Sequence, residues 1–434
     1  MATIQRPRPG NLPERRTQVD GQRQDRRQRQ LGDRDLPSWP ITAAFALIPL
    51  WFLLGLHGFM WLVLAVPITI SLLLKPRLVI PKGSAWWMLF LAAVLFSALS
   101  LDSPGRAAGW ALRLGYATAA FSYALYALNG GRTLTVWHIV RALTWLWMGT
   151  VAGGFLAFVI GTVSYRAPLY YLFPGVLLEN DLIRTLVTPS FADVQDIIGF
   201  SVPRPKAPYD YTNTWGSMLA LLTPFAFISL SDRRAGFSSR LIGGVLVASI
   251  VPGVLSLNRG LWLSLGIGVV YVALRLGVLG DGKLIVRGTV VACFLVAILG
   301  LSPLGDVALT RIDTGHSNGD RTELIVSALD GTAERPLFGW GAPRPNRRGL
   351  PSVGTHGQLW YLLFSHGVIG AMGYIGFFAS ATIRSWRQTS SSGIWLHSVL
   401  IILAVQSLFY LTIPTQLFLA MVTAMLAIRA QREL

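Results

Sequence analysis

An arginine and a histidine stand beside long apolar blocks, where charged and polar side chains are costly and usually functional. Arg259 lies in the run Asn258-Arg259-Gly260-Leu261, with an apolar block on each side. Its guanidinium would hold a phosphate group through two parallel hydrogen bonds, and the alternative is an arginine that only extends to a membrane surface. His356 precedes a later block, where a neutral imidazole suits a general base and the alternative is a histidine without a role.

A second set of candidates lies in a proline-rich run between residues 202 and 216. Prolines stiffen this run, which presents Arg204 and Lys206 and ends with Asn213. Two cations near aromatic and amide groups suit a glycan that carries phosphate, and the alternative is a loop that only packs over the helices. Arg321 opens a predicted helix, and its alternative is a solvated surface charge.

Other polar residues carry less chemistry. His366 is expected to be a packed or hydrogen-bonded helix residue, and His316 lies in a polar run and is expected to be solvated. The basic cluster Arg344, Arg347 and Arg348 is expected to form a solvated face.

Several chemistries lack support in the sequence. No Gly-Lys-Ser/Thr phosphate loop, Gly-x-Ser-x-Gly element, His-Glu-x-x-His signature or Asp-x-Asp signature lies where it would be needed. Cys293 is the single cysteine, which excludes a disulfide and a cysteine metal cluster. We therefore expect no cofactor and no metal site. The apolar blocks hold few acids, which argues against a proton-relay transporter.

The elements that position these residues follow from composition. The chain of 434 residues is 53% hydrophobic and 13% charged, whereas about 25% charge is usual for soluble domains. The apolar residues form long blocks, which is typical of membrane helices. The sequence predicts an all-α polytopic membrane protein with about 12 transmembrane helices. The predicted blocks are 41–56, 58–74, 85–101, 110–128, 140–163, 215–230, 241–257, 261–277, 288–304, 358–380, 395–412 and 415–429.

The N-terminal residues 1–38 differ from the rest of the chain. They hold nine arginines and five acidic residues and have few aliphatic side chains, so they cannot bury enough apolar surface to fold. This tail is too long and too charged for a signal peptide. The net charge of +17 raises the question of nucleic acid. A basic tail beside a first span more often lies on the anionic cytoplasmic leaflet, so we expect no nucleic-acid partner.

The distribution of basic residues predicts the topology of the segment 39–434. With both termini in the cytoplasm, 24 of the 37 basic residues fall on the cytoplasmic side, in line with the positive-inside rule. The two long loops 164–214 and 305–357 then face outward. Short surface helices are expected around 168–178. A further helix should begin at Asp320 and end at Gly331.

The sequence around the candidate residues resembles that of the O-antigen ligase and polysaccharide polymerase superfamily of bacterial membrane glycosyltransferases. The resemblance spans about residues 40–430 and rests on four stretches in order. In this family His-Asn often stands where the present chain has His356-Gly357. The four stretches are Tyr211–Gly216 preceded by Arg204, the junction Asn258-Arg259-Gly260, Asp320-Arg321 followed by Pro336–Gly341, and Thr355-His356 followed by Gly367–Gly370.

The resemblance implies a GT-C-like membrane fold and a transfer reaction at the outer face of the cytoplasmic membrane. A glycan would pass from a polyprenyl-pyrophosphate carrier to an acceptor hydroxyl on a glycan, lipid or protein, with inversion and without an essential metal. His356 would be the base, and Arg259 would stabilise the leaving pyrophosphate, together with Arg204 and Arg321. Lys206 and Asn213 are the other expected substrate-binding residues.

Two other functions stay open. One is a transporter or flippase of a lipid-linked glycan or anionic solute, which would depend on polar residues deep in the spans. The other is a non-catalytic scaffold in a polysaccharide assembly complex, in which changes at His356 and Arg259 would be silent.

Overall fold

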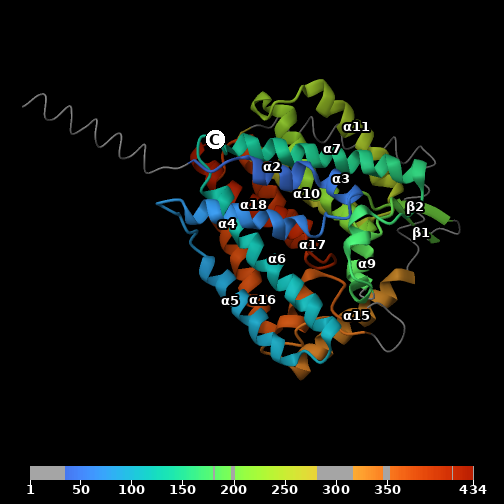
Figure 1. Ribbon diagram of the computed structural model, residues 1–434. Coiled ribbons are helices and arrows are strands. Elements are labelled where there is room, and N and C mark those ends of the chain that lie inside the picture. Colours follow the sequence, from blue (N-terminus) through green and yellow to red (C-terminus); the bar gives the residue numbers. More distant parts are fainter. Residues whose placement is uncertain are drawn as a thin grey trace, which may run out of the picture.

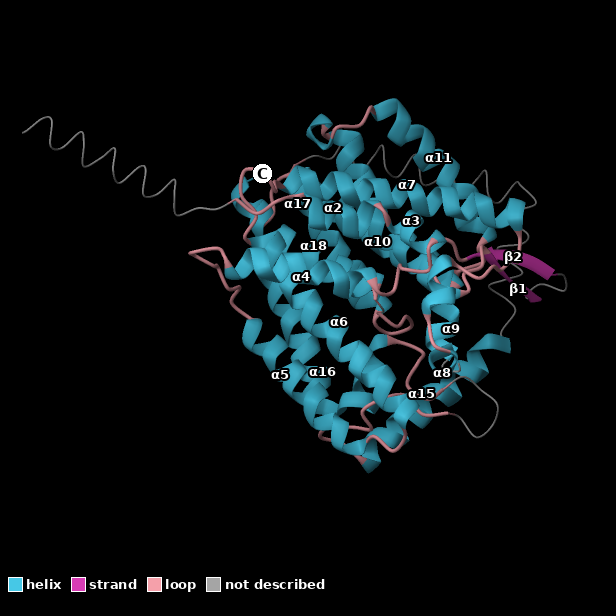
Figure 2. Ribbon diagram, in the orientation of Figure 1, coloured by secondary structure: helices cyan, strands magenta, loops and turns pink. Residues whose placement is uncertain are grey.

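The computed structural model describes residues 35–178, 181–196, 201–280, 316–345, 352–412 and 414–433. Helices make up most of this part of the chain, and a single small hairpin lies at one edge (Figures 1 and 2). The longer helices and two short N-terminal ones are α2 (Trp39–Ala46), α3 (Ile48–Leu53), α4 (Met60–Leu73), α5 (Ser84–Ser97), α6 (Pro104–Leu128), α7 (Val136–Ile160), α10 (Thr212–Ser231), α11 (Ser239–Leu255), α12 (Arg259–Val278), α16 (Gln358–Ser385), α17 (Ser391–Gln406) and α18 (Thr415–Glu433).

Several of these helices have the length and composition of membrane spans. Four of them, α7, α10, α12 and α16, are long and apolar enough to cross a membrane, and α4, α5, α11 and α17 are shorter apolar helices. The chain is thus consistent with an integral membrane protein, and the count of twelve spans stays a prediction.

Two of the predicted blocks do not correspond to a single described helix. Block 41–56 was expected to be one span and is instead divided into α2 and α3. Pro49 in the first turn of α3 explains the break, because proline lacks the N–H that would continue α2. Block 288–304 lies outside the described residues.

Polar side chains mark the starts of several helices. Ser103, Thr135, Ser238, Asn258 and Ser390 each accept a hydrogen bond from a backbone N–H in the first turn of the helix that follows. Such caps satisfy N–H groups that have no partner within the helix. The apolar runs are therefore separated by sequence-encoded helix starts.

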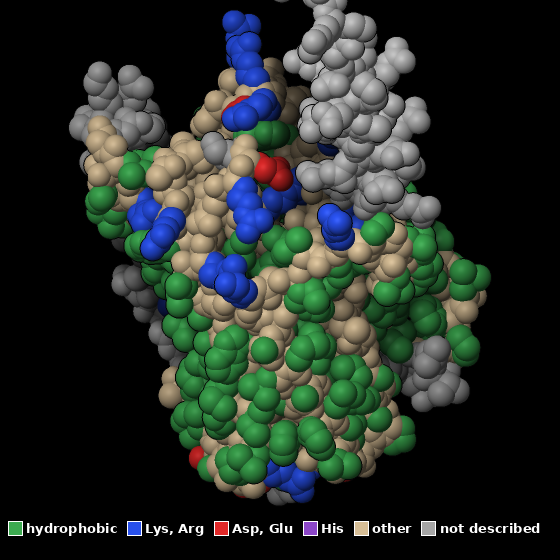
Figure 3. All heavy atoms as spheres, turned by 90° about the vertical axis from the view of Figure 1, so that its left-hand side faces the viewer, with side chains coloured by type: hydrophobic (Ala, Val, Ile, Leu, Met, Phe, Trp, Pro, Cys, Tyr) green, Lys and Arg blue, Asp and Glu red, His purple; other side chains and the backbone are tan. Residues whose placement is uncertain are grey.

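The core is built around α18, which lies among the other helices in Figure 1 and is buried from Thr415 to Ala430. Phe418 stacks on Trp61 of α4 with ring centroids 4.4 Å apart, and its edge meets Tyr123 of α6. Apolar side chains on the outer helices, such as Val66 and Phe96, are exposed instead. Figure 3 shows a broad apolar surface with Lys and Arg side chains gathered above it and a smaller group below, as expected for a surface that faces lipid.

Polar contacts tie together one end of the helical body, which we call the terminal end. Arg132 donates its backbone N–H to Asp35 (3.1 Å), and Arg429 near the C-terminus donates to the Leu134 carbonyl (2.8 Å). The Val79 N–H donates to the Asn129 side chain (2.7 Å). The described start of the chain and its C-terminal helix therefore lie at the same end, as expected for an even number of spans. Which side of the membrane this end faces stays a prediction.

The opposite end, which we call the loop end, holds the described residues within 101–103, 164–211, 256–259, 316–357 and 407–414. Strands β1 and β2 pair with Asp193 opposite Arg204, and this hairpin was not predicted from the sequence. The short elements of this end are η1 (Ala98–Ser100), η2 (Pro168–Leu172), α8 (Gly175–Leu178), α9 (Asp181–Val187), β1 (Ala192–Asp196), β2 (Ser201–Pro205) and α15 (His316–Glu334), and η3 (Arg233–Ala235) lies at the terminal end.

Helix α15 differs from the predicted 320–331. It begins at His316 and continues past Gly331 to Glu334. A Cβ at Gly331 would lie 2.5 Å from the Phe364 ring, so glycine serves close packing at this position and does not end the helix.

Candidate active site at the loop end

Arg204 ties the hairpin to the start of α12. Its side chain is buried, with 6% exposure, and its Nε donates to the Ser256 carbonyl (2.9 Å). The next residue, Leu257, has φ 52°, a left-handed conformation that is uncommon for leucine. This turn ends α11 and starts α12 with Asn258 as its cap and Arg259 as its first residue. Two predicted site residues, Arg204 and Arg259, are thus joined through the segment 256–259.

Asn258 connects the same segment to two other elements. Its Nδ2 donates to the Thr212 carbonyl at the start of α10 (3.4 Å), and its Oδ1 accepts from the Tyr410 hydroxyl. Gly216 and Gly260 permit this approach, because a Cβ at either position would lie 2.3 Å from Asn258 Nδ2 or from the Tyr410 hydroxyl. The sequence motifs around 213 and 258 therefore meet in space.

His356 belongs to the segment that follows in this network. Gln358 donates its N–H to the Tyr410 carbonyl (2.8 Å), and its side chain accepts from the Thr412 N–H (2.9 Å). The start of α16 is thereby fixed to the chain that touches Asn258. Arg204 and the chain neighbours of Arg259 and His356, namely Asn258 and Gln358, thus lie along one connected set of contacts.

The hydrogen bonds of Thr355 determine which ring nitrogen carries the proton when His356 is neutral. Thr355 Oγ1 donates its only proton to the Ser352 carbonyl (2.6 Å) and lies 3.1 Å from His356 Nδ1. The hydroxyl can therefore only accept from the ring, so Nδ1 carries the proton and the lone pair is on Nε2. A base needs such an unprotonated nitrogen.

The other predicted binding residues are less central. Lys206 donates to Ser190 Oγ within the same loop (2.8 Å), and Asn213 is half-buried in the first turn of α10. Arg321 belongs to α15, but its side chain lies outside the description, as do Arg347 and Arg348. The structure brings Asn213 near Asn258 and leaves the roles of Lys206 and Arg321 as predictions.

Helix α16 is broken at Gly367, which has φ 67° and ψ −171°. The segment 336–341 fills this break: Trp340 N–H donates to the Phe364 carbonyl (2.9 Å), Gly341 N–H to the Ser365 carbonyl (2.7 Å), and Val368 N–H to the Pro336 carbonyl (2.8 Å). Irregular backbone within an apolar region needs such internal partners. The Pro-Leu-Phe-Gly-Trp-Gly motif thus has a structural reason.

His366 stands at this break and is fully engaged, as expected from the sequence. Ser97 Oγ donates to the Val94 carbonyl (2.6 Å) and lies 3.0 Å from Nδ1, so Nδ1 carries the ring proton. Nε2 lies 3.1 Å from the Tyr361 hydroxyl, which leaves this histidine no role as a base in the arrangement seen.

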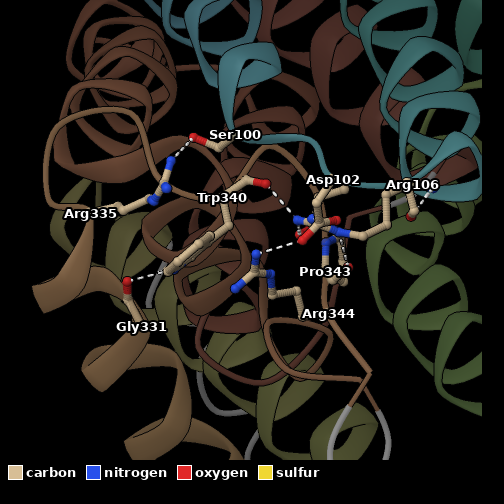
Figure 4. Close-up of polar contacts among 10 residues, drawn as sticks. Ser100, Asp102, Arg106, Gly331, Arg335, Trp340, Pro343 and Arg344 are labelled. Atoms are coloured by element: carbon tan, nitrogen blue, oxygen red, sulfur yellow. Dashed lines mark hydrogen bonds and ion pairs between the residues drawn. The ribbon is translucent and has the colours of Figure 1, made fainter.

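A cluster of charges fixes the same segment from outside (Figure 4). Arg106 donates to Asp102 and to the Trp340, Ala342 and Pro343 carbonyls, at 2.6, 2.8 and 3.2 Å for the carbonyls. Arg344 also pairs with Asp102, at 2.6 Å. The hydrogen bond from Arg106, and next that from Arg344, lower the pKa of Asp102.

Arg344 has partners that the sequence did not predict, although its side chain is 35% exposed. Its guanidinium lies 3.7 Å from the Trp340 ring centroid, and that of Arg335 lies 4.3 Å from it. Figure 4 shows the Trp340 ring between these two groups. The Arg344 carbonyl oxygen accepts a hydrogen bond from the Val353 N–H (2.8 Å). This contact fixes Val353, three residues before His356. The sequence alone gave no sign that Asp102, 242 residues away, is the partner of Arg344.

The cleft residues at the loop end were not found from the sequence. Two adjoining hollows share Arg113, Tyr116 and Pro414, and together we call them the Arg113 cleft. An arginine among apolar residues near the start of block 110–128 was the available signal. The other lining residues are Leu186, Asp210, Tyr211 and Thr214 on one side, and Phe90, Val94, Ala117, Gln358, Tyr361, His366, Tyr374, Thr412 and Leu417 on the other.

A carboxylate faces the same cleft. Asp210 Oδ1 lies 2.6 Å from Nε2 of His57, whose side chain is 3% exposed. Within the described residues, no group of three or more His, Cys, Asp or Glu side chains is arranged to hold a metal ion.

Comparison with known proteins agrees with the motifs. No family model matches the chain. The chain is similar to a protein described as an O-antigen ligase from Pseudomonas aeruginosa strain PAO1, with 25% identity over 356 residues, which covers 79% of this chain and 75% of that protein. The likeness to an O-antigen ligase therefore extends over most of the chain.

Proposed function

We propose that this protein transfers a glycan from a polyprenyl-pyrophosphate carrier to an acceptor hydroxyl at the outer face of a bacterial inner membrane. The loop end would face outward, and both termini would be cytoplasmic. The observation that carries the proposal is the contact of the start of α16, two residues after His356, with Tyr410, whose hydroxyl donates to Asn258 beside Arg259. The similarity to a protein described as an O-antigen ligase supports the reaction class.

The reaction follows from these groups. His356 Nε2 takes the proton of the acceptor hydroxyl while its oxygen attacks the anomeric carbon of the donor glycan. The bond from that carbon to the pyrophosphate oxygen breaks, and the carrier pyrophosphate leaves with the electron pair. Attack from the opposite side inverts the anomeric carbon. Arg259 and Arg204 stabilise the negative charge on the leaving group, and Arg321 is a further candidate.

The apolar surface gives the carrier a place to lie. Helices α4 and α5 expose Val66, Ile70 and Phe96, so a polyprenyl chain can stay in lipid while its pyrophosphate reaches the loop end. Lys206 and Asn213 would contact the glycan portion.

The test compares wild type, His356→Ala and Arg259→Ala at equal membrane abundance in a strain that lacks this protein. Removal of a general base costs about 10²–10⁴ in rate, so lipid-linked glycan should accumulate and the transferred product should be lost in both variants. Lys75→Met, at the terminal end, is the control. Normal product from both variants would reject this site and favour a transporter or scaffold.

A further inference from the structure

Arg113 of α6 is a cation that forms no ion pair with the described residues. Its guanidinium lies 5.7 Å from the Tyr361 ring centroid. Among the described residues, none forms an ion pair with Arg113 or accepts a hydrogen bond from it. A charged group in an apolar helical body normally finds a partner, and one that does not is expected to serve a ligand.

The surroundings of Arg113 limit the chemistry of that ligand. Tyr116, Tyr361 and Phe90 provide aromatic walls. Thr214 and Asp210 provide polar groups on the side of the outer loop. The aromatic walls suit a sugar ring, the guanidinium suits an oxyanion, and a carboxylate held by His57 can accept hydrogen bonds from hydroxyl groups.

The Arg113 cleft is separate from the side of Arg204 and Arg259. The described residues 407–412 and 414 lie between them, because Tyr410 contacts Asn258 on one side while Thr412 and Pro414 line the cleft on the other. Gln358 also lines the cleft, two residues after His356. Two cationic positions thus flank one segment, and Gln358, two residues after His356, contacts that segment.

We propose that the Arg113 cleft binds a sugar that carries a phosphoryl or carboxylate group, and that this sugar belongs to the acceptor. The assignment to the acceptor rests on the proposed transfer function, whereas the binding of an anionic sugar does not. A transferase must hold two substrates at once, and the donor pyrophosphate would occupy the Arg204–Arg259 side.

Binding can be measured without transfer activity. Saturation-transfer-difference NMR on the full chain in a neutral detergent would use glucose 6-phosphate, glucuronate and uncharged glucose. We expect the anionic sugars to bind about tenfold or more tightly than glucose, and Arg113→Gln to remove that difference. The two anionic probes distinguish phosphoryl from carboxylate recognition.

Matched variants make the result specific. Arg240→Gln, an exposed arginine at the terminal end, should bind like wild type. Thr214→Phe should weaken binding by filling the cleft, and it keeps the test available if Arg113→Gln does not fold. Unchanged binding in folded Arg113→Gln, or in folded Thr214→Phe, would overturn the proposal.

A competition experiment tests the assignment to the acceptor. Farnesyl pyrophosphate stands for the donor head group and should not displace glucose 6-phosphate, either from wild type or from Arg259→Ala. Displacement from Arg259→Ala would show that the cleft takes the carrier pyrophosphate and would overturn the acceptor assignment. An inactive His356→Ala variant that still binds the anionic sugars would support both proposals, while an active one would reject only the transfer mechanism.

Discussion

The terminal end and the loop end both carry many polar groups, but they use them differently. At the terminal end, Asn129 accepts from the Val79 N–H (2.7 Å) and donates to the Val79 and Leu125 carbonyls (2.8 and 2.9 Å). Arg429 similarly donates hydrogen bonds to the Ala127 and Leu134 carbonyls. Side chains there complete the hydrogen bonding of helix ends, which is what a stable end requires.

The loop end instead combines charged side chains with unusual backbone. Leu257 and four glycines with positive φ belong to it, and a fifth such glycine, Gly367, lies at the break of α16. Positive φ is costly for a residue with a side chain, such as Leu257, and concentrates at functional sites. Glycine adopts it readily, as Gly236 does at the terminal end. The loop end therefore differs from the terminal end by the left-handed conformation of Leu257 and by charged side chains that join distant segments. The four glycines are Gly339, Gly341, Gly354 and Gly357.

The largest expected effect comes from Gly367→Ala. A Cβ there would lie 2.3 Å from the Leu337 backbone, and φ is 67°, so the segment 336–341 would have to leave the break in α16. We expect a loss of ~3 kcal/mol or more in the free energy of unfolding. Thermal unfolding in detergent measures it.

The matched control is Gly244→Ala in α11, where a Cβ would meet nothing within 4 Å. Alanine is the better helix former, so this variant should gain roughly 0.5–1 kcal/mol. Similar losses in both variants would remove the distinction between a built loop end and ordinary helix glycines.

The sequence predicted a mostly helical chain with apolar helices, because composition is a local signal, and the count of twelve spans stays a prediction. It also selected Arg204, Arg259 and His356, whose segments contact one another through Ser256, Asn258 and Tyr410 and whose roles stay predictions. It could not pair Asp102 with Arg344 or place Pro336–Gly341 in the break of α16, because these contacts join distant segments. Arg113 was missed because its block reads as an ordinary span until the opposing walls from α5, α16 and the outer loop are known.

A smaller effect is expected from Arg106→Met. Its side chain is 10% exposed, and its removal would leave the carbonyls of Trp340, Ala342 and Pro343 without this donor. We expect a loss of ~2 kcal/mol and faster proteolysis of the segment 336–345. Arg432→Met, an exposed residue at the terminal end, should change neither quantity. Equal proteolysis of the two variants would show that Arg106 does not hold this segment.

The smallest effect concerns the ion pairs of the two ends under acid. Hydrogen bonds from Arg106 and Arg344 lower the pKa of Asp102, and one from Arg234 lowers that of Asp232 at the terminal end. For a carboxyl with a lowered folded pKa, the stabilisation is complete above the ordinary value of 3.8 and is lost as the pH falls through the folded pKa. Both pairs should therefore open only below that ordinary value.

Their consequences should differ, because Asp102 joins two distant segments and Asp232 pairs with a residue two positions away. Acid should change the fluorescence of Trp340, taken as wild type minus Trp340→Phe, and Asp102→Asn should show the opened state already at neutral pH. Asp232→Asn keeps an oxygen to cap η3 and should alter stability by no more than about 0.5 kcal/mol, with the Trp340 signal unchanged. If Asp232→Asn shifted that signal as much as Asp102→Asn, the two ends would be coupled, and the loop end would not be the separately built region that this comparison describes.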